Sequence, residues 1–337
     1  MTVLYVVSDR EGAGKTALCA TLASKLAGMD KKVALLKPVA ASGLDAGDDP
    51  DPASYAGLLG IPTDGWPFGK GEGPLGDDIE GRTKAEVDRM SSVADIVIVE
   101  GSTALTPEEH RRLADTLDAK VLAVVAYNPD IPSDDLASWL SRLGDRAVGA
   151  VVNGSTRHRG REAGAALKPS MCPNGVTTYG VVPEDRRLLG VCVGQLSQHL
   201  DGRFMSGEDA SDGLVEHLMV GGRGMDPGEH YFGVRDSKAV IVRGDRPDVQ
   251  MAALTTSTAC MVMTKGIEPI EYVQYEAREE GVPVIVVETD TIETMEALNG
   301  LMDSARFDHP LKLARYSELA DEHIDLPALY GALDIAV

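Results

Sequence analysis

The sequence predicts an α/β fold: a parallel sheet with helices on both faces, plus a second, smaller α/β domain. Short runs of Val, Ile, Leu and Ala alternate with stretches of helical periodicity, which is typical of parallel strands buried on both faces. A glycine-bearing loop that ends in Gly-Lys-Thr follows the first apolar run. At 337 residues the chain is also long for one hydrophobic core, so we expect two domains.

A phosphate-binding loop (P-loop) is predicted at residues 8–16, which read SDREGAGKT. The loop follows the apolar run 3–7 and precedes a helical pattern over 17–26, and this order of strand, loop and helix is the context in which a P-loop occurs. Backbone N–H groups of such a loop, and the N-terminus of its helix, bind phosphate oxygens. We expect the nucleotide to contact Glu11, Gly12, Ala13, Gly14, Lys15, Thr16 and Ala17.

Two residues of this loop have specific expected roles. Lys15 would hold the β- and γ-phosphates, and the Thr16 hydroxyl would sit on Mg²⁺. The strict pattern places glycine where this chain has Asp9. The strand before the loop and the helix after it nevertheless favour nucleotide binding, with ATP and Mg²⁺ as the cofactors, over a chance Gly-Lys-Thr.

The other elements of the first domain follow in order. A short helix is expected over 53–59, and a Gly-, Pro- and Asp-rich segment over 61–81 predicts a surface loop of the kind that often covers a site. Buried strands are expected at 32–38, 96–99, 121–125, 148–152 and 176–182.

Charged residues follow two of these strands, at the edge of a parallel sheet where ligands bind. Glu100 follows the strand 96–99, and a carboxylate there can hold Mg²⁺ against the phosphates. Lys37 ends the preceding strand, where it could neutralise charge on a transferring phosphate. An ordinary strand-end acid and a solvated lysine before a turn are the alternatives.

Three aspartates beyond Lys37 are candidates for a further Mg²⁺ ligand: Asp48, Asp49 and Asp51. Asp51 is the best placed of them, because we expect it to be the N-cap of the helix that follows. Asn153 ends the fifth strand, where its amide could pair with an adenine edge, although a turn residue is the simpler interpretation. Pro183 ends the sixth strand in a similar way, or starts a helix.

The regular alternation of strands and helices ends after residue 200, and we expect domains at 1–202 and 203–337. Residues 201–212 are polar and predict a linker, followed by a helix over 214–220. Strands are then expected at 239–242, 260–263 and 282–287, and a packed helix pair over 311–337.

Composition excludes several classes of function. The chain has 32 Lys and Arg against 53 Asp and Glu, a net charge of −21, which argues against nucleic acid as a main partner. Its scattered Cys and His residues show no zinc-site spacing. Since no apolar run approaches the length of a membrane span, we expect a cytoplasmic protein that does not bind membranes.

The motifs together resemble the dethiobiotin synthetase family of P-loop proteins. The likeness covers roughly residues 1–200 and rests on SDREGAGKT, LLKPVAASG, DIVIVEG, AVVNG and YGVVPEDRRL. The N-terminal region of long phosphotransacetylases is more similar still, and there a DRTGG domain follows. Residues 205–305 resemble that domain through AVIVRGDRPDVQMAAL, TTSTACMVMTKG and EEGVPVIVVETDTIETMEAL. No acetyl-transferring domain would fit in the remaining chain, so phosphotransacetylase activity is not expected from this chain alone.

The resemblance implies roles for particular residues. Lys15, Thr16, Lys37 and Glu100 carry over as phosphate, Mg²⁺ and substrate-side groups, and Asn153 carries over as the adenine reader. The sequence departs from the synthetases by an extra alanine before Ser42-Gly43, which puts the diamine substrate site in doubt.

The function that this resemblance implies is Mg-ATP binding by an ATPase or ATP-dependent enzyme, whose DRTGG domain senses an unidentified small molecule or protein. An ATP-dependent ligase of the synthetase type and a non-catalytic regulatory subunit are the alternatives. Arg10 stands where deviant loops of the form K-G-G-x-G-K-T have a second lysine. It could therefore act catalytically on the phosphates of a partner in a homodimer, or simply pair with Asp9 or Glu11 at the surface.

Overall fold

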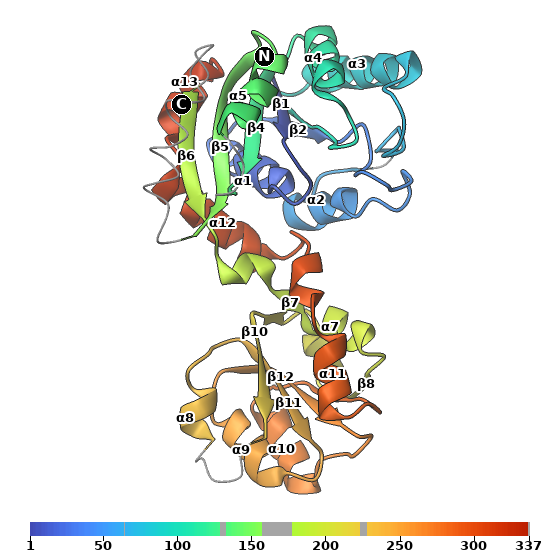
Figure 1. Cartoon of the computed structure of the whole chain (residues 1–337), viewed down its shortest axis with the longest axis vertical. Helices are drawn as coiled ribbons and strands as arrows, with labels where there is room; N and C mark the ends of the chain where they lie inside the picture. Colours follow the sequence, from blue (N-terminus) through green and yellow to red (C-terminus); the bar gives the residue numbers. More distant parts are fainter. Residues whose placement is uncertain (64, 129–132, 157–176, 223–227, 336–337) are drawn as a thin grey trace. The chain divides into compact units, whose positions relative to one another are not determined.

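The computed structural model describes residues 1–63, 65–128, 133–156, 177–222 and 228–335. The chain divides into two compact units. Unit 1 comprises Met1–Asp185 and Phe307–Val337, and unit 2 comprises Arg186–Arg306 (Figure 1).

Unit 1 is built on a parallel sheet of six strands in the order β2-β3-β1-β4-β5-β6. The strands are β1 Thr2–Ser8, β2 Val33–Leu36, β3 Ile96–Glu100, β4 Lys120–Ala126, β5 Ala147–Ser155 and β6 Thr177–Pro183. Most of their apolar side chains are buried, as the Val, Ile and Leu runs predict. The expected parallel sheet is confirmed. The first residue of the predicted sixth strand, residue 176, lies outside the described residues.

Helices cover both faces of this sheet (Figure 1). α1 contacts α2 and α12 on one face, whereas α3 contacts α4, and α4 contacts α5, on the other. The helices of unit 1 are α1 Lys15–Ala27, α2 Asp51–Leu59, α3 Asp77–Ser91, α4 Pro107–Leu117, α5 Ser133–Arg142, α12 Pro310–His323 and α13 Leu326–Ala332. The longest of the described helices, α3, has 15 residues, and no described helix could cross a membrane.

The C-terminal helix pair belongs to unit 1. The pair was expected over 311–337, but as part of the second domain. The backbone N–H of Asp325 donates to the carbonyl of Tyr179 over 2.8 Å, and the Thr2 hydroxyl donates to the carbonyl of Leu333 over 3.0 Å. These bonds fix the tail to β6 and β1, so the chain leaves unit 1 after residue 185 and returns at 307. This division differs from the expected boundary between residues 202 and 203.

Unit 2 contains a sheet of five strands in the order β10-β11-β12-β13-β8, in which β8 is antiparallel and the rest are parallel. The strands are β8 Arg203–Ser206, β10 His217–Gly221, β11 Lys238–Arg243, β12 Thr258–Thr264 and β13 Val284–Val286; β7 Val191–Cys192 and β9 Leu214–Val215 form a small separate ladder. Three short segments precede or connect these strands: η1 Arg186–Leu189, α7 Val193–His199 and η2 Glu208–Ala210. A fourth, η3 Leu301–Ser304, follows the last strand.

Two hydrophobic clusters lie on opposite faces of this second sheet. One includes residues of α8 Glu229–Phe232, α9 Pro247–Leu254 and α10 Glu271–Glu279. The other includes residues of α7 and the end of α11 Thr291–Ala297 with the segment that follows it. Unit 2 is therefore a mixed α/β domain, as the strand and helix alternation predicts.

Two predictions for unit 2 were wrong. The segment 214–220 forms β9 and β10 instead of a helix, and the predicted linker 201–212 contains β8. A short apolar run does not by itself distinguish a helix from a buried strand. Leu218 and Met219 pack against opposite clusters, which is the alternation of a strand.

Candidate nucleotide-binding site

The loop between β1 and α1 has the backbone shape that its glycines allow. Gly12 has φ 70° and Gly14 has φ 93°, which are left-handed conformations that favour glycine. A Cβ atom on Gly14 would lie 2.0 Å from Nδ2 of Asn153. Nδ2 of Asn153 donates to the carbonyl of Ala13 over 2.9 Å. The structure therefore places Asn153 directly against the loop.

The N-terminus of α1 is open to an anion. No side chain caps this helix, and its first turn holds no acidic residue. By contrast, Thr106 and Glu109 cap α4 with reciprocal hydrogen bonds. The first N–H groups of a helix have no partner within it, and they attract anions together with the helix dipole. The residues expected to contact phosphate lie at this open terminus.

Lys15 is the first residue of α1. Its Nζ donates to Oγ of Ser8 over 2.8 Å, so the last residue of β1 holds the ammonium group over the loop. Burial lowers the Lys15 pKa, and the nearby Glu100 carboxylate partly offsets this effect. Ser8 was not singled out from the sequence, because serine is common at strand ends and no local pattern indicates that its hydroxyl meets a lysine.

Thr16 and Glu100, both expected beside Mg²⁺, are in direct contact. The Thr16 hydroxyl donates to Oε1 of Glu100 over 3.0 Å, and the Tyr55 hydroxyl donates to Oε2. Glu100 is only 1% exposed, and burial raises its pKa, with a further contribution from Asp51. Tyr55 was missed, because its position within a short helix does not indicate that its hydroxyl reaches β3.

Lys37 is not solvated, so the alternative of a surface lysine is wrong. Its side chain is 2% exposed, and Nζ lies 2.8 Å from a carboxylate oxygen of Asp49. It forms a second ion pair with Asp51. Burial alone would lower the Lys37 pKa, but Glu100, Asp51 and Asp49 outweigh burial and raise it.

The three aspartates after β2 differ in their roles. Asp48 is exposed. Asp49 is buried and accepts hydrogen bonds from the backbone N–H groups of Ala41 over 2.7 Å and Asp51 over 2.9 Å. Asp51 is the first residue of α2, and the N-cap is Pro50. The expected N-cap role of Asp51 is therefore wrong, although its carboxylate does reach the buried charges.

The residues at this edge have donor groups that fit Mg²⁺. Hydroxyl and carboxylate oxygens are its usual protein ligands, and it commonly takes only one or two carboxylates together with substrate phosphates. Thr16, Glu100 and Asp51 supply such oxygens in one region. Among the described residues, no group of three or more His, Cys, Asp or Glu side chains could hold a metal ion, so a metal here would need phosphate oxygens as well.

Arg10 and Glu11 lie on the outer side of the loop. Nε of Arg10 lies 2.7 Å from a carboxylate oxygen of Asp9, and the other oxygen of Asp9 accepts from the backbone N–H of Ala126 over 3.0 Å. Surface pairing with Asp9 is thus the arrangement observed, and Glu11 is exposed. A catalytic role for Arg10 across a homodimer stays a prediction.

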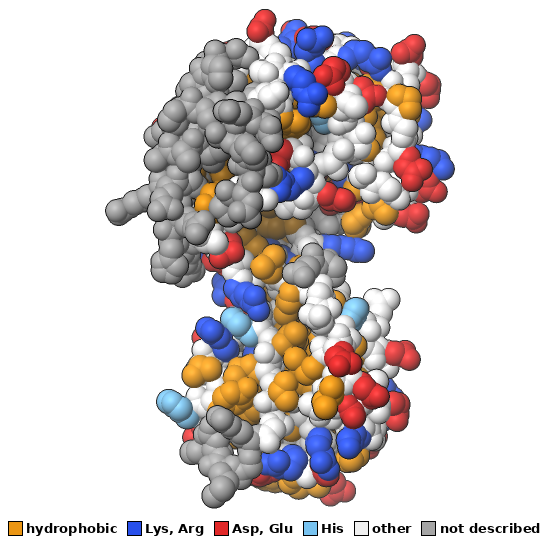
Figure 2. All heavy atoms as spheres, in the orientation of Figure 1, with side chains coloured by type: hydrophobic (Ala, Val, Ile, Leu, Met, Phe, Trp, Pro, Cys, Tyr) orange, Lys and Arg blue, Asp and Glu red, His pale blue; other side chains and the backbone are white. Residues whose placement is uncertain are grey.

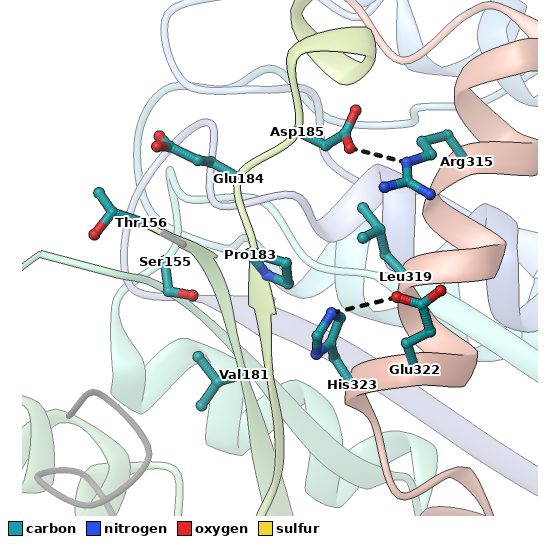
Figure 3. Close-up of a pocket in the computed structure, with 10 residues that line it drawn as sticks. All are labelled: Ser155, Thr156, Val181, Pro183, Glu184, Asp185, Arg315, Leu319, Glu322 and His323. Atoms are coloured by element: carbon teal, nitrogen blue, oxygen red, sulfur yellow. Dashed lines mark hydrogen bonds and ion pairs between the residues drawn. The ribbon is translucent and has the colours of Figure 1, made fainter. Parts of the chain in front are cut away.

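A hollow of about 540 Å³ lies where β5 and β6 end beside α12. Figure 3 shows Val181, Pro183 and Leu319 around it, with Asp185 facing Arg315 at one side. That ion pair measures 2.9 Å. Ser155 at the end of β5 and Pro183 at the end of β6 both line the hollow. Contact of Pro183 with a nucleotide stays a prediction.

Comparison with known proteins agrees with the expected order of domains. Residues 195–301 match the DRTGG domain family. Over 174 residues the chain is 27% identical to the phosphate acetyltransferase of Nitratidesulfovibrio vulgaris, a match that covers 48% of this chain and 24% of that enzyme. The chain thus spans about a quarter of that relative's length. The predicted DRTGG domain and the predicted likeness to part of a phosphotransacetylase are confirmed.

Several solved structures are similar to parts of this chain. The MinD cell division protein of Aquifex aeolicus is 19% identical, with a TM-score of 0.38, over 56% of this chain and 85% of that chain. The FtsY protein of Thermotoga maritima is 17% identical, with a TM-score of 0.38, over 54% and 62%. The CBS and DRTGG domains of the Clostridium perfringens pyrophosphatase, complexed with the activator diadenosine tetraphosphate, are 15% identical, with a TM-score of 0.30, over 37% and 53%.

Proposed function

We propose that unit 1 binds a nucleoside triphosphate, with ATP as the ligand, together with Mg²⁺. The observation that carries this proposal is the uncapped N-terminus of α1 behind the left-handed Gly14. Phosphate oxygens would accept hydrogen bonds from the first N–H groups of α1. The Lys15 ammonium, held by Ser8 at 2.8 Å, would turn to the β- and γ-phosphates.

The metal would lie beside Thr16 and Glu100. A hydroxyl that donates to a carboxylate keeps lone pairs for a cation, so the 3.0 Å bond from Thr16 to Glu100 aims an oxygen at the metal position. Tyr55 fixes the other oxygen of Glu100. Bound Mg²⁺ would neutralise phosphate charge and orient the terminal phosphate.

The base would enter the hollow at the ends of β5 and β6. Asn153 contacts the loop at Ala13 and lies two residues before Ser155, which lines the hollow, and Oδ1 of its amide could accept from an exocyclic amine. Val181, Pro183 and Leu319 offer apolar contacts for a planar ring. The base site would therefore include α12, which follows unit 2 in the sequence.

ATP hydrolysis or regulated binding agrees better with Lys37 than a synthetase-type ligase does. Asp49 and Asp51 both hold the Lys37 ammonium in a buried network. A lysine engaged in this way can stabilise charge at the phosphates, but it is not free to receive a second substrate. The DRTGG region would then regulate unit 1 in response to a ligand.

Thermal unfolding with nucleotide tests this proposal, because a ligand that binds only the native state raises the melting temperature. ATP with Mg²⁺ should raise it, and omission of Mg²⁺ should reduce the shift. Glu100→Gln should weaken Mg-ATP binding roughly tenfold or more, the effect expected for a group that supports a metal, and leave metal-free ATP binding nearly intact. A Glu100→Gln protein with an unchanged Mg²⁺ dependence would contradict the metal assignment.

A further inference from the structure

We propose that unit 2 binds a small amphiphilic anion, a molecule with an apolar body and one anionic head, in a hollow between β10 and α11. The hollow has a volume of about 630 Å³. This site goes beyond the nucleotide site of unit 1 and does not depend on it. It gives the ligand-sensing role proposed for the DRTGG region a location and a chemistry.

The walls of the hollow are mostly apolar. They include Leu218 and Val220 from β10 and Ile292, Met295 and Leu298 from α11 and the residue that follows it. β10 is an edge strand with β11 as its neighbour in the sheet. Figure 2 shows hydrophobic side chains gathered over this part of unit 2. An apolar surface with a few polar groups is typical of a small-molecule site.

The apolar wall belongs to a packed core and is not a set of isolated surface residues. Leu298 is 2% exposed and is part of the hydrophobic cluster on this face, and the half-buried Leu218, Met295 and Met302 pack against that cluster. Ile292 is 70% exposed at the rim. The floor is therefore fixed by the core, whereas the rim is open to an apolar ligand.

Two polar residues of the hollow, Arg186 and Asn299, lie toward one end, whereas Thr291 begins α11 and Glu296 lies along it. Nε of Arg186 donates to the carbonyl of Glu216 over 3.2 Å, which places Arg186 beside the start of β10. β10 and β13 run in the same direction in the sheet. α11 follows β13 and runs back along the sheet, so the end of α11 lies near the start of β10. Asn299, just after α11, lines this same end.

The positive charge of Arg186 favours a ligand whose anionic head lies at this end of the hollow. Within the part of the chain that the structure describes, the Arg186 guanidinium has no ion pair. The nearby carboxylate of Glu216 pairs with Arg187 instead, over 2.7 Å. A guanidinium and an amide together suit a carboxylate or phosphate oxygen. Glu296 lines the hollow along α11 and would repel an anion there, so the apolar body lies along α11 and the head lies at Arg186.

Calorimetric titration with octanoate tests this site in the full chain, with 1-octanol as a neutral probe of the same length. Octanoate should bind once per chain and about fivefold tighter than octanol, as a partly exposed ion pair provides. Arg186→Gln should remove that preference. Ile292→Glu should weaken both probes, and it should not unfold the protein because the side chain is exposed. Arg243→Gln and Val234→Glu, two exposed positions elsewhere in unit 2, are the controls.

Three results would overturn the proposal. Octanoate could fail to bind to the folded protein, Ile292→Glu could bind it as well as the unmodified protein does, or Arg186→Gln could keep the preference for octanoate. Saturation with Mg-ATP should leave the octanoate titration unchanged, so a failure of this site and a failure of the nucleotide site are measured separately.

Discussion

Charged side chains gather where the parallel strands end in both sheets, but the two sheets hold them differently. In unit 1, Lys37 and Asp49 form an ion pair with side chains 2% and 0% exposed. The Thr16 hydroxyl reaches Glu100, which lies 84 residues further along the chain. Charges and hydroxyls from several helices, strands and loops therefore meet in one buried network.

In unit 2 the ion pairs at the corresponding edge are largely exposed, and two of them join residues close in the sequence. Arg243 pairs with Asp245, and Arg246 pairs with Asp248, each only two residues along the chain. Such exposed pairs contribute little to stability. Burial of charge is costly unless every partner is present, so a buried network at a strand edge indicates a functional site, whereas the exposed pairs do not.

Removal of one partner from the buried network should have the largest effect. Asp49→Ala leaves Lys37 with one carboxylate fewer and the backbone N–H of Ala41 without its acceptor. We expect a loss of roughly 3–5 kcal/mol in the free energy of unfolding, measured by urea denaturation. Asp245→Ala is the matched change in unit 2 and should leave that free energy unchanged. Equal losses from the two variants would remove the distinction between the two edges.

The assignment of α12 to unit 1 can be tested by two leucine truncations. Leu319 on α12 and Leu298 in the unit 2 core are each 2% exposed. Substitution of either by Ala should lower the free energy of unfolding by about 2–5 kcal/mol. Hydrogen exchange should show lost protection in peptides of unit 1 for Leu319→Ala, and in peptides of unit 2 for Leu298→Ala. Loss of protection confined to unit 2 in the Leu319 variant would contradict the assignment of the tail to unit 1.

A buried histidine should make the stability of unit 1 depend on pH. His110 is hydrogen-bonded to the Tyr5 hydroxyl over 2.7 Å, and burial lowers its pKa from 6.5 to about 3. The folded state thus keeps the ring neutral while the unfolded chain protonates it. The stabilisation is complete above pH 6.5 and is lost as the pH falls toward 3.

Urea denaturation between pH 7.5 and 5 measures this effect. Well below pH 6.5, the free energy of unfolding should fall by about 1.4 kcal/mol for each pH unit of acidification because of His110 alone. His110→Gln should remove that contribution, and His230→Gln, an exposed histidine of unit 2, should keep the slope of the unmodified protein. A His110→Gln protein with an unaltered slope would show that this ring does not cause it.

The sequence alone predicted the parts of the site that depend on local pattern. The loop 8–16, Glu100 and Lys37 were found because each follows an apolar strand. Ser8 and Tyr55 were not found, because their contributions depend on where their hydroxyls point after folding. The Tyr55 hydroxyl bonds Glu100 across 45 residues of sequence, a separation that no local pattern reports.

Prediction of the fold from the sequence is limited in the same way, to features that a local pattern reports. The six strands of unit 1 could be predicted because each contains a short apolar run, and in β1, β3 and β4 this run is almost continuously buried. β8 lies within a segment, 201–212, that predicts a linker because it is polar, and its four residues, RFMS, form an edge strand only through pairing with β13. The return of the tail to unit 1 depends on contacts such as that of Thr2 with Leu333, 331 residues apart.

Calorimetric titration of Mg-ATP into three proteins tests the central claim most directly. Lys15 begins α1 in unit 1, and Lys265 follows β12 at the corresponding edge in unit 2, where it is exposed. The unmodified protein and Lys265→Ala should bind one Mg-ATP per chain with the same affinity, and Lys15→Ala should give no measurable binding. Binding that survives in Lys15→Ala, or is lost in Lys265→Ala, would contradict the assignment of the nucleotide site to unit 1.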